Sequence, residues 1–341
     1  MKAAVFYGPH QPLKIETVAD PTPGAGELLV KVAACGLCHT DLHYIDHDVP
    51  TAKRPPLILG HEASGTVTAV GQDVKGFAVG DRVLVPAVFS CGECRQCRRG
   101  RENICERMVM PGNHVDGAYA EYMVAPAKDV LHLPDEIPLV DACIIADAVS
   151  TPYNAVKNRG QVRPGDTVAV FGCGGVGLNV VQIAAASGAN VIAVDISDEK
   201  LEHARRFGAH ATVKGGEGKE VSKEIKRLSG GGVDIAFEAI GYPPTIVQAF
   251  DSLARGGRLV QVGYCQHPVQ LNVSRLMFFE MEVIGSLGCS PLDYLPLIDL
   301  VARGRLKLSE LISHRVPLDR INEGLDYLRQ GQGIRNIVVM D

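Results

Sequence analysis

The stretch TVAVFGCGGVGLNVVQIAAASGANVIAVD, residues 167–195, decides the fold of the second half of this chain. An apolar run ending at Phe171 is typical of a buried strand. A GxGxxG pattern follows, then a helix-forming run, and then a second apolar strand that ends at Asp195. Glycines alone would be weak evidence, but in this strand–helix–strand context they predict a dinucleotide-binding unit.

Each glycine of this motif has a physical purpose. Gly172 permits the tight turn, Gly174 lets the backbone approach a pyrophosphate, and Gly177 lets the helix pack closely on the strand. The helix N-terminus offers unpaired N–H groups to the phosphates. We assign Gly175 and Val176 to the same cofactor-binding loop. The alternative is a glycine-rich turn without a ligand, which the surrounding pattern disfavours.

Asp195 lies 18 residues after Gly177, at a strand end. A carboxylate there can accept hydrogen bonds from both adenosine ribose hydroxyls and would repel a 2′-phosphate, so we expect NAD rather than NADP. The alternative is an aspartate exposed on the surface. We also assign Lys200, five residues further on, to the cofactor site.

Strands and helices alternate throughout this half of the chain. The expected strands are 191–195, 211–214, 233–241, 258–263 and 282–288, and the expected helices are 175–187, 198–208, 219–228 and 245–257. Such alternation implies right-handed crossovers and a parallel, doubly wound sheet. The first half instead has short strands punctuated by Gly and Pro. We therefore predict an α/β protein with a β-rich domain (1–148), an inserted Rossmann domain (149–287) and a return to the first domain (288–341).

Composition excludes several function classes. With 341 residues and 46% hydrophobic residues, the chain is long enough for two domains with separate cores. The net charge of -5 and the absence of Trp argue against a nucleic-acid or anionic membrane partner. The N-terminal MKAAVFYGPH is expected to be a strand, not a signal peptide. We therefore expect a cytoplasmic protein whose ten cysteines stay reduced.

Four cysteines are clustered in CGECRQCRRGRENIC, residues 91–105: Cys91, Cys94, Cys97 and Cys105. Four thiolates can surround one Zn²⁺ tetrahedrally and leave no open position, so this site is structural. One alternative is a group of unligated thiols. Another is a nucleic-acid-binding zinc ribbon, because five arginines surround the cluster. The acidic net charge favours a solvated rim or a subunit contact for those arginines.

A second set of metal-binding residue types is dispersed. CGLCHTDLH (35–43) contains Cys38, and LGHEASG (59–65) contains His61. Cys35 and Cys38 also form a CxxC pair, but a redox role would need this pair at a helix start in a different fold. CGLCHTDLH, GHEASGTV, the four-cysteine lobe and GCGGVG have the order and approximate spacing found in the zinc-containing medium-chain alcohol dehydrogenases. The sequence resembles that family over essentially its whole length.

The resemblance implies a GroES-like catalytic domain, a Rossmann domain and an active site between them. Cys38 and His61 would then be ligands of a catalytic zinc. The family's third ligand is commonly Cys, but the matching residue in IADAVSTPYNAV (145–156) is Asp147. Carboxylate oxygen is an acceptable zinc ligand, and one Cys with one Asp carries the formal charge of two Cys. Asp147 could instead cap a helix, with Cys143 or Glu62 as the ligand.

The resemblance also assigns a proton path and phosphate contacts. Thr40 would meet the substrate oxygen, and His43 would pass the proton to solvent, unless His43 is an ordinary surface histidine. Asp41 should accept a hydrogen bond from His61 and fix its tautomer. His39 and Arg335 match residues that contact the pyrophosphate.

We therefore expect a dehydrogenase with two zinc ions per chain that transfers hydride between a small-molecule alcohol and NAD. Members of the family are often oligomers, and we favour a homotetramer over a dimer. MPGNHVDG (110–117) and DAVSTPY (147–153) resemble a branch that oxidises alicyclic hydroxyacyl-CoA esters. The sequence also leaves room for a polyol dehydrogenase, an enoyl reductase or a non-catalytic relative. Enoyl reductases of this superfamily generally lack both zinc sites, so the cysteines argue against that class.

Overall fold

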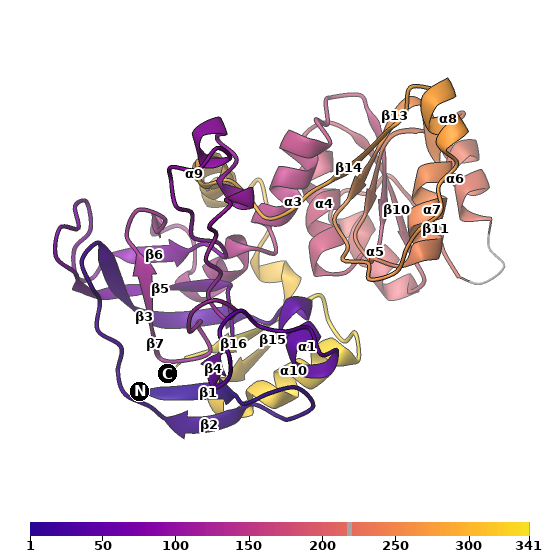
Figure 1. Ribbon diagram of the computed structural model, residues 1–341. Coiled ribbons are helices and arrows are strands. Elements are labelled where there is room, and N and C mark those ends of the chain that lie inside the picture. Colours follow the sequence, from indigo (N-terminus) through magenta and orange to yellow (C-terminus); the bar gives the residue numbers. More distant parts are fainter. Residues whose placement is uncertain (217–219, 341) are drawn as a thin grey trace. The chain divides into compact units, whose positions relative to one another are not determined.

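The computed structural model describes residues 1–216 and 220–340. Contacts between Cα atoms divide the chain into two compact units, in which Met1–Ser150 and Gly288–Asp341 form the first and Thr151–Leu287 forms the second. Both units combine strands with helices (Figure 1), which confirms the predicted α/β class.

The second unit is built on a six-stranded parallel sheet with the strand order β11-β10-β9-β12-β13-β14. Its strands are β9 (Thr167–Phe171), β10 (Asn190–Asp195), β11 (Ala211–Lys214), β12 (Val233–Glu238), β13 (Leu253–Gln261) and β14 (Glu282–Gly285). Its helices are α4 (Gly175–Ala186), α5 (Asp198–Arg206), α6 (Val221–Ser229), α7 (Pro243–Asp251) and α8 (Val273–Phe278), and α3 (Ser150–Asn154) and the π-helical turn η4 (Ala155–Arg159) precede β9. This strand order is the doubly wound arrangement that the alternating pattern predicts.

Both faces of this sheet are buried. On β9, Ala169 and Phe171 belong to an apolar cluster that also contains Ile225 of α6 and Phe250 of α7. Successive residues of a strand point to opposite faces. Val168 and Val170 of β9 are equally buried and face the other side. The unbroken apolar strand in the sequence follows from this double coverage.

One expected helix is too long at its C-terminal end. The pattern predicts a helix over 245–257, but α7 ends at Asp251 and β13 begins at Leu253. Leu253 is buried and pairs with Val233 before a register shift in the ladder, so packing overrides the helical periodicity. The first residue of the helix expected over 219–228 lies outside the described residues, and the helix there is α6.

The first unit contains two sheets. The larger has the order β15-β16-β3-β5-β6-β8, with β7 also paired to β3, and the smaller has the order β2-β1-β4. The strands are β1 (Lys2–Phe6), β2 (Lys14–Thr17), β3 (Glu27–Gly36), β4 (Leu57–Ile58), β5 (Ala63–Val70), β6 (Arg82–Val85), β7 (Tyr122–Pro126), β8 (Leu131–His132), β15 (Ile312–Pro317) and β16 (Arg335–Val339). The helices are α1 (His39–Asp46), α2 (Leu139–Ala142), α9 (Pro291–Ala302) and α10 (Ile321–Arg329), with short 3-10 turns η1 (Cys97–Arg99), η2 (Glu102–Ile104), η3 (Cys143–Ala146), η5 (Ser309–Leu311) and η6 (Leu318–Arg320).

The strand pairing of the first unit gathers the residues that the sequence motifs mark. β3 pairs with β5 on one side and with β16 on the other. The segments entering or leaving these strands are therefore neighbours, although they are far apart in sequence. In the described parts of the chain, no helix has both the length and the apolar character needed to cross a bilayer.

Candidate metal centres and dinucleotide loop

Four side chains of the first unit converge in one place: those of Cys38, His61, Glu62 and Asp147. Cys38 is the N-cap of α1, just after β3 ends. His61 and Glu62 lie immediately before β5, and Asp147 follows the turn η3. One potential ligand atom from each of the four lies within 4.8 Å of the others. The pairing of β3 with β5 brings the first three together, and η3 supplies the fourth.

The distances among three of these groups suit one small metal ion. Asp147 Oδ2 is 3.9 Å from Cys38 Sγ and 3.7 Å from His61 Nε2. Tetrahedral ligands at ordinary Zn–N, Zn–O and Zn–S lengths lie roughly 3.3–3.8 Å apart. One thiolate, one imidazole and one carboxylate form a donor set that zinc accepts, with a fourth position left open.

Asp41 lies on the far side of the His61 ring. His61 Nδ1 is 3.6 Å from Asp41 Oδ1, and both residues are buried. Neither ring nitrogen of His61 nor Asp41 Oδ1 has a hydrogen-bond partner within the described residues. Burial would lower the pKa of His61, but the carboxylates of Asp41 and Asp147 outweigh it and raise this pKa well above its usual value. A buried imidazole held between anionic groups fits a metal cation on Nε2.

Glu62 and Arg335 form a buried ion pair beside this cluster. One guanidinium nitrogen of Arg335 donates to both carboxylate oxygens of Glu62. Burial alone would lower the pKa of Arg335, but Glu62 raises it, so the guanidinium stays charged. The Arg335 side chain is only 5% exposed. The family resemblance assigns Arg335 to a pyrophosphate contact, whereas in this structure its guanidinium binds Glu62, and the phosphate role stays a prediction.

Helix α1 carries the residues assigned to proton transfer. Thr40 Oγ1 lies 3.6 Å from Cys38 Sγ. His43 is one turn further on, and residues three apart share a face of a helix. Burial and, secondarily, the nearby His47 lower the pKa of His43, so it is mostly neutral at pH 7 and can accept a proton. His39, at the first position of α1, is exposed.

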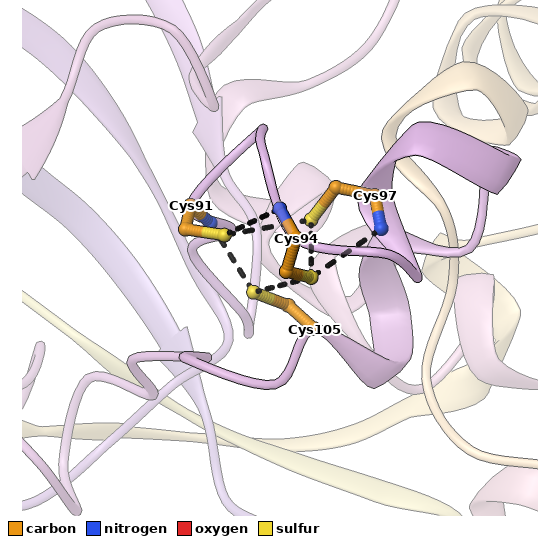
Figure 2. A group of neighbouring side chains, drawn as sticks. All are labelled: Cys91, Cys94, Cys97 and Cys105. Carbon is orange, nitrogen blue, oxygen red and sulfur yellow. Dashed lines mark hydrogen bonds between the residues drawn. The ribbon is translucent and has the colours of Figure 1, made fainter.

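The four clustered cysteines form a separate group (Figure 2). Sγ of Cys94 is 3.4 Å from Sγ of Cys97 and 3.9 Å from Sγ of Cys105, and Cys91 Sγ is 3.9 Å from Cys97 Sγ. Four sulfurs around one zinc ion would lie about 3.8 Å apart. All ten cysteines of the chain have free thiols, so no disulfide competes for them.

Backbone N–H groups donate hydrogen bonds to sulfur atoms of this lobe. Cys105 Sγ accepts from Cys91 N and Arg107 N, both at 3.3 Å, and Cys91 Sγ accepts from Cys94 N at 3.4 Å. Backbone hydrogen bonding lowers the pKa of Cys91 to about 6, whereas desolvation raises that of Cys97 to about 12. The arginines that border the lobe are exposed, as a solvated rim requires: Arg95, Arg98, Arg99, Arg101 and Arg107.

We expect Cys94→Ser to release one metal ion per chain and to lower the melting temperature by about 5–10 °C, because the lobe has almost no apolar core apart from its cysteines. Metal analysis and thermal unfolding measure both effects. Cys265→Ser, which removes a thiol from the second unit, is the matched control and should leave the metal content unchanged. Full metal content in Cys94→Ser would contradict the structural role.

The glycine loop joins β9 to α4, as its position in the sequence predicts. A Cβ on Gly177 would lie 1.7 Å from the Gly172 carbonyl oxygen, so only glycine allows this approach of helix to strand. Gly172 itself has φ +92°, which favours glycine. Around Gly174 a Cβ would meet nothing within 4 Å, which leaves space for a ligand beside the helix N-terminus that Gly175 and Val176 begin.

Asp195 ties the end of β10 to this loop. Its Oδ2 accepts a hydrogen bond from Cys173 N at 2.8 Å, and its Oδ1 accepts one from Ser197 N at 3.0 Å. Each carboxylate oxygen retains a further lone pair for a ribose hydroxyl. Lys200 lies in α5, one turn after its N-cap Ser197.

The competing interpretations of the other cysteines lose support. Cys35 is fully buried in β3, and burial raises its pKa, which opposes the reactivity that a redox pair needs. Cys143 is also buried, and among the described residues it does not belong to either metal-binding group.

The alternative for Asp147 is that its side chain caps a helix. Its carboxylate instead contacts Cys38 and His61, and a helix cap would not require these contacts.

Tyr119 is part of the centre, although no sequence motif marks it. Its hydroxyl donates a 2.7 Å hydrogen bond to Asp41 Oδ2. The segment GAYAEY contains two tyrosines, and nothing in the sequence distinguishes Tyr119 from tyrosines in other core strands and loops, so only the contact with Asp41 reveals its place.

Comparisons with known proteins show which family the chain resembles in sequence and fold. Residues 24–135 match the alcohol dehydrogenase GroES-like domain, and residues 175–303 match the zinc-binding dehydrogenase domain. An alcohol dehydrogenase of Geobacillus stearothermophilus is 39% identical over 97% of this chain and 96% of its own length. A solved NAD-dependent alcohol dehydrogenase superposes with a TM-score of 0.93 at 30% identity, with all of both chains covered. An acryloyl-coenzyme A reductase of Sulfurisphaera tokodaii is 32% identical over 99% of both chains. The chain therefore belongs to the zinc-containing medium-chain alcohol dehydrogenase family.

Proposed function

We propose that this protein is a zinc-dependent alcohol dehydrogenase that transfers hydride reversibly between a primary or secondary alcohol and NAD. The observation that carries the proposal is the convergence of Cys38, His61 and Asp147 in a chain whose other unit holds a dinucleotide loop. The second metal, in the four-cysteine lobe, would be structural, which gives two zinc ions per chain.

Cys38, His61 and Asp147 would hold the catalytic zinc. Its positive charge would lower the pKa of an alcohol at the open position. As ligands, Cys38 and Asp147 would balance the charge of the ion. Asp41 Oδ1, 3.6 Å from His61 Nδ1, would favour the tautomer that frees Nε2. Held by the three ligand side chains, the ion would set the position of the alcohol oxygen before reaction.

The proton leaves through residues of α1. Thr40, whose hydroxyl lies next to Cys38 Sγ, would accept the proton from the alcohol while releasing its own hydroxyl proton, and His43 would pass a proton to solvent. The lowered pKa of His43 keeps this imidazole unprotonated near neutral pH and therefore ready to accept. On the cofactor side, Asp195 would bind the adenosine ribose, and the N-terminus of α4 would bind the pyrophosphate.

The direct test is to measure NAD reduction by the purified chain with primary, secondary, aromatic and alicyclic alcohols, together with its zinc content. We expect two zinc ions per chain and turnover with at least one alcohol. His61→Ala is the matched variant, and we expect it to lose turnover and one zinc while keeping its secondary structure. A chain with two zinc ions that reduces NAD with none of these alcohols would contradict the proposal.

A CoA-linked substrate is the second candidate, and the resemblance to an acryloyl-coenzyme A reductase favours it. Hydroxyacyl-CoA esters with NAD and enoyl-CoA esters with NADH belong in the same screen. A kcat/KM at least tenfold higher for a CoA ester than for its free alcohol would select this candidate. We also propose, as sequence-based predictions, a cytoplasmic location and a homotetramer.

A further inference from the structure

We propose that Tyr119 is a positioning residue for the zinc ligand His61: its ring packs against the backbone before His61, and its hydroxyl fixes Asp41 behind His61. The inference rests on the proposed catalytic centre and adds to it a residue that lies outside the family motifs quoted above. Tyr119 touches neither substrate nor cofactor in this scheme and acts through Asp41.

The backbone around Tyr119 is tied to the segment that ends at His61. Tyr119 N donates to Leu59 O, and Ala118 N donates to Gly60 O, both at 2.9 Å. On its other side, Tyr119 O accepts from Ala4 N at 2.8 Å. The position of the Tyr119 side chain relative to His61 is therefore set by main-chain hydrogen bonds on both sides.

The ring of Tyr119 fills the space where Gly60 has no side chain. Gly60 has φ +96°, and a Cβ there would lie 2.6 Å from the Tyr119 Cδ1 atom. Real Cβ atoms do not approach so closely, so the ring lies directly against the backbone of the residue that precedes His61. Tyr119 is fully buried, and its ring cannot move away without opening a void in the core.

The hydroxyl of Tyr119 holds one oxygen of Asp41. Tyr119 Oη is 2.7 Å from Asp41 Oδ2 and 3.3 Å from Gly36 O, and a single proton serves the shorter, charge-assisted bond. Burial and then Asp41 raise the pKa of Tyr119 well above its usual value, so the hydroxyl keeps this proton. Among the residues that the structure describes, Asp41 Oδ2 also accepts from Cys38 N, at the longer distance of 3.3 Å.

With Oδ2 held in this way, Asp41 Oδ1 is directed toward His61 Nδ1 at 3.6 Å. A buried carboxylate that loses a hydrogen-bond donor is expected to rotate toward another donor, because burying an unsatisfied charge costs free energy. Asp41 would then hold the His61 ring less firmly. Loss of a partner to a metal-ligating histidine typically costs 10–100-fold in metal affinity. Tyr119 acts on His61 only through Asp41, so we expect its loss to lower zinc affinity about tenfold.

The test compares Tyr119→Phe with Tyr44→Phe. Each variant loses one buried hydroxyl from the first unit. The Tyr44 hydroxyl accepts a hydrogen bond from Asn113 and does not bond to Asp41. Zinc affinity is measured by competition with a chelator, with the lobe's zinc as the internal reference. We also record the visible spectrum with Co²⁺ at the weaker site.

We expect Tyr119→Phe to weaken one of the two zinc sites about tenfold and to shift the Co²⁺ spectrum, while Tyr44→Phe changes neither. Because Tyr119 acts through Asp41, Asp41→Asn combined with Tyr119→Phe should lose no more affinity than Asp41→Asn alone. Wild-type affinity and spectrum in Tyr119→Phe, or fully additive losses in the double variant, would overturn the inference. If the wild-type chain holds only the zinc that Cys94→Ser releases, the proposed centre itself fails, and that result is distinct from the others.

Discussion

Asp147→Ala is expected to lose the catalytic zinc and to lose turnover in step with it. The carboxylate of Asp147 lies 3.9 Å from Cys38 Sγ and 3.7 Å from His61 Nε2, in the place of a third ligand. Removing a whole ligand should cost more than the 10–100-fold in affinity that is typical of residues hydrogen-bonded to a ligand. Asp147→Asn keeps the shape of the side chain but not its charge, and it should lose less zinc affinity than Asp147→Ala. Asp147→Cys should largely preserve binding, because thiolate is a good zinc ligand.

Zinc per chain and melting temperature, measured together, separate a ligand from a structural aspartate. Asp141→Asn is the matched control, since Asp141 is a buried carboxylate of the same unit that pairs with Arg315 at 2.7 Å. It should lower the melting temperature and leave both zinc ions in place. Full zinc content and near-normal turnover in Asp147→Ala would remove Asp147 from the catalytic centre.

Asp195→Ala is expected to reduce kcat/KM with NAD about 10–100-fold and to raise it with NADP. A hydrogen bond to a charged acceptor contributes about 1.5–3 kcal/mol, and a factor of ten corresponds to about 1.4 kcal/mol. The NADP value should rise because the carboxylate no longer repels the 2′-phosphate. Initial rates with both cofactors at saturating alcohol measure the change in preference.

The contacts of Asp195 within the protein require a control for a loosened loop. The carboxylate also accepts from Cys173 N and Ser197 N, so its removal weakens the glycine loop itself. Loosening alone would lower kcat/KM with both cofactors. Asp234→Ala removes a similar cap, on Thr167 N at the other end of β9, and should leave the cofactor preference unchanged. An unchanged NAD-to-NADP ratio in Asp195→Ala would contradict the ribose assignment.

The sequence determined those features that depend on neighbours in the chain. Four cysteines within fifteen residues can reach one ion whatever the rest of the fold does, and the lobe indeed brings their sulfurs together. The glycine motif likewise requires only the strand before it and the helix after it. Alternating strands and helices were enough to predict the doubly wound sheet. The predicted end of the helix over 245–257 is wrong, because the pairing of Leu253 with β12 outweighs local periodicity there.

Only the tertiary structure decided which distant residues meet. Asp147 and Cys38 are 109 residues apart in the sequence, and Arg335 and Glu62 are 273 apart. The motif match nominated Asp147, but it could not show that its carboxylate faces Cys38 and His61. Its assignment of Arg335 to a phosphate stays a prediction, and it could not show that the pairing of β16 with β3 buries this guanidinium against Glu62. No motif marked Tyr119, because its proposed role depends on tertiary contacts with Gly60 and Asp41. Local spacing fixes which atoms can share an ion, whereas strand pairing and burial determine which charged groups must neutralise one another.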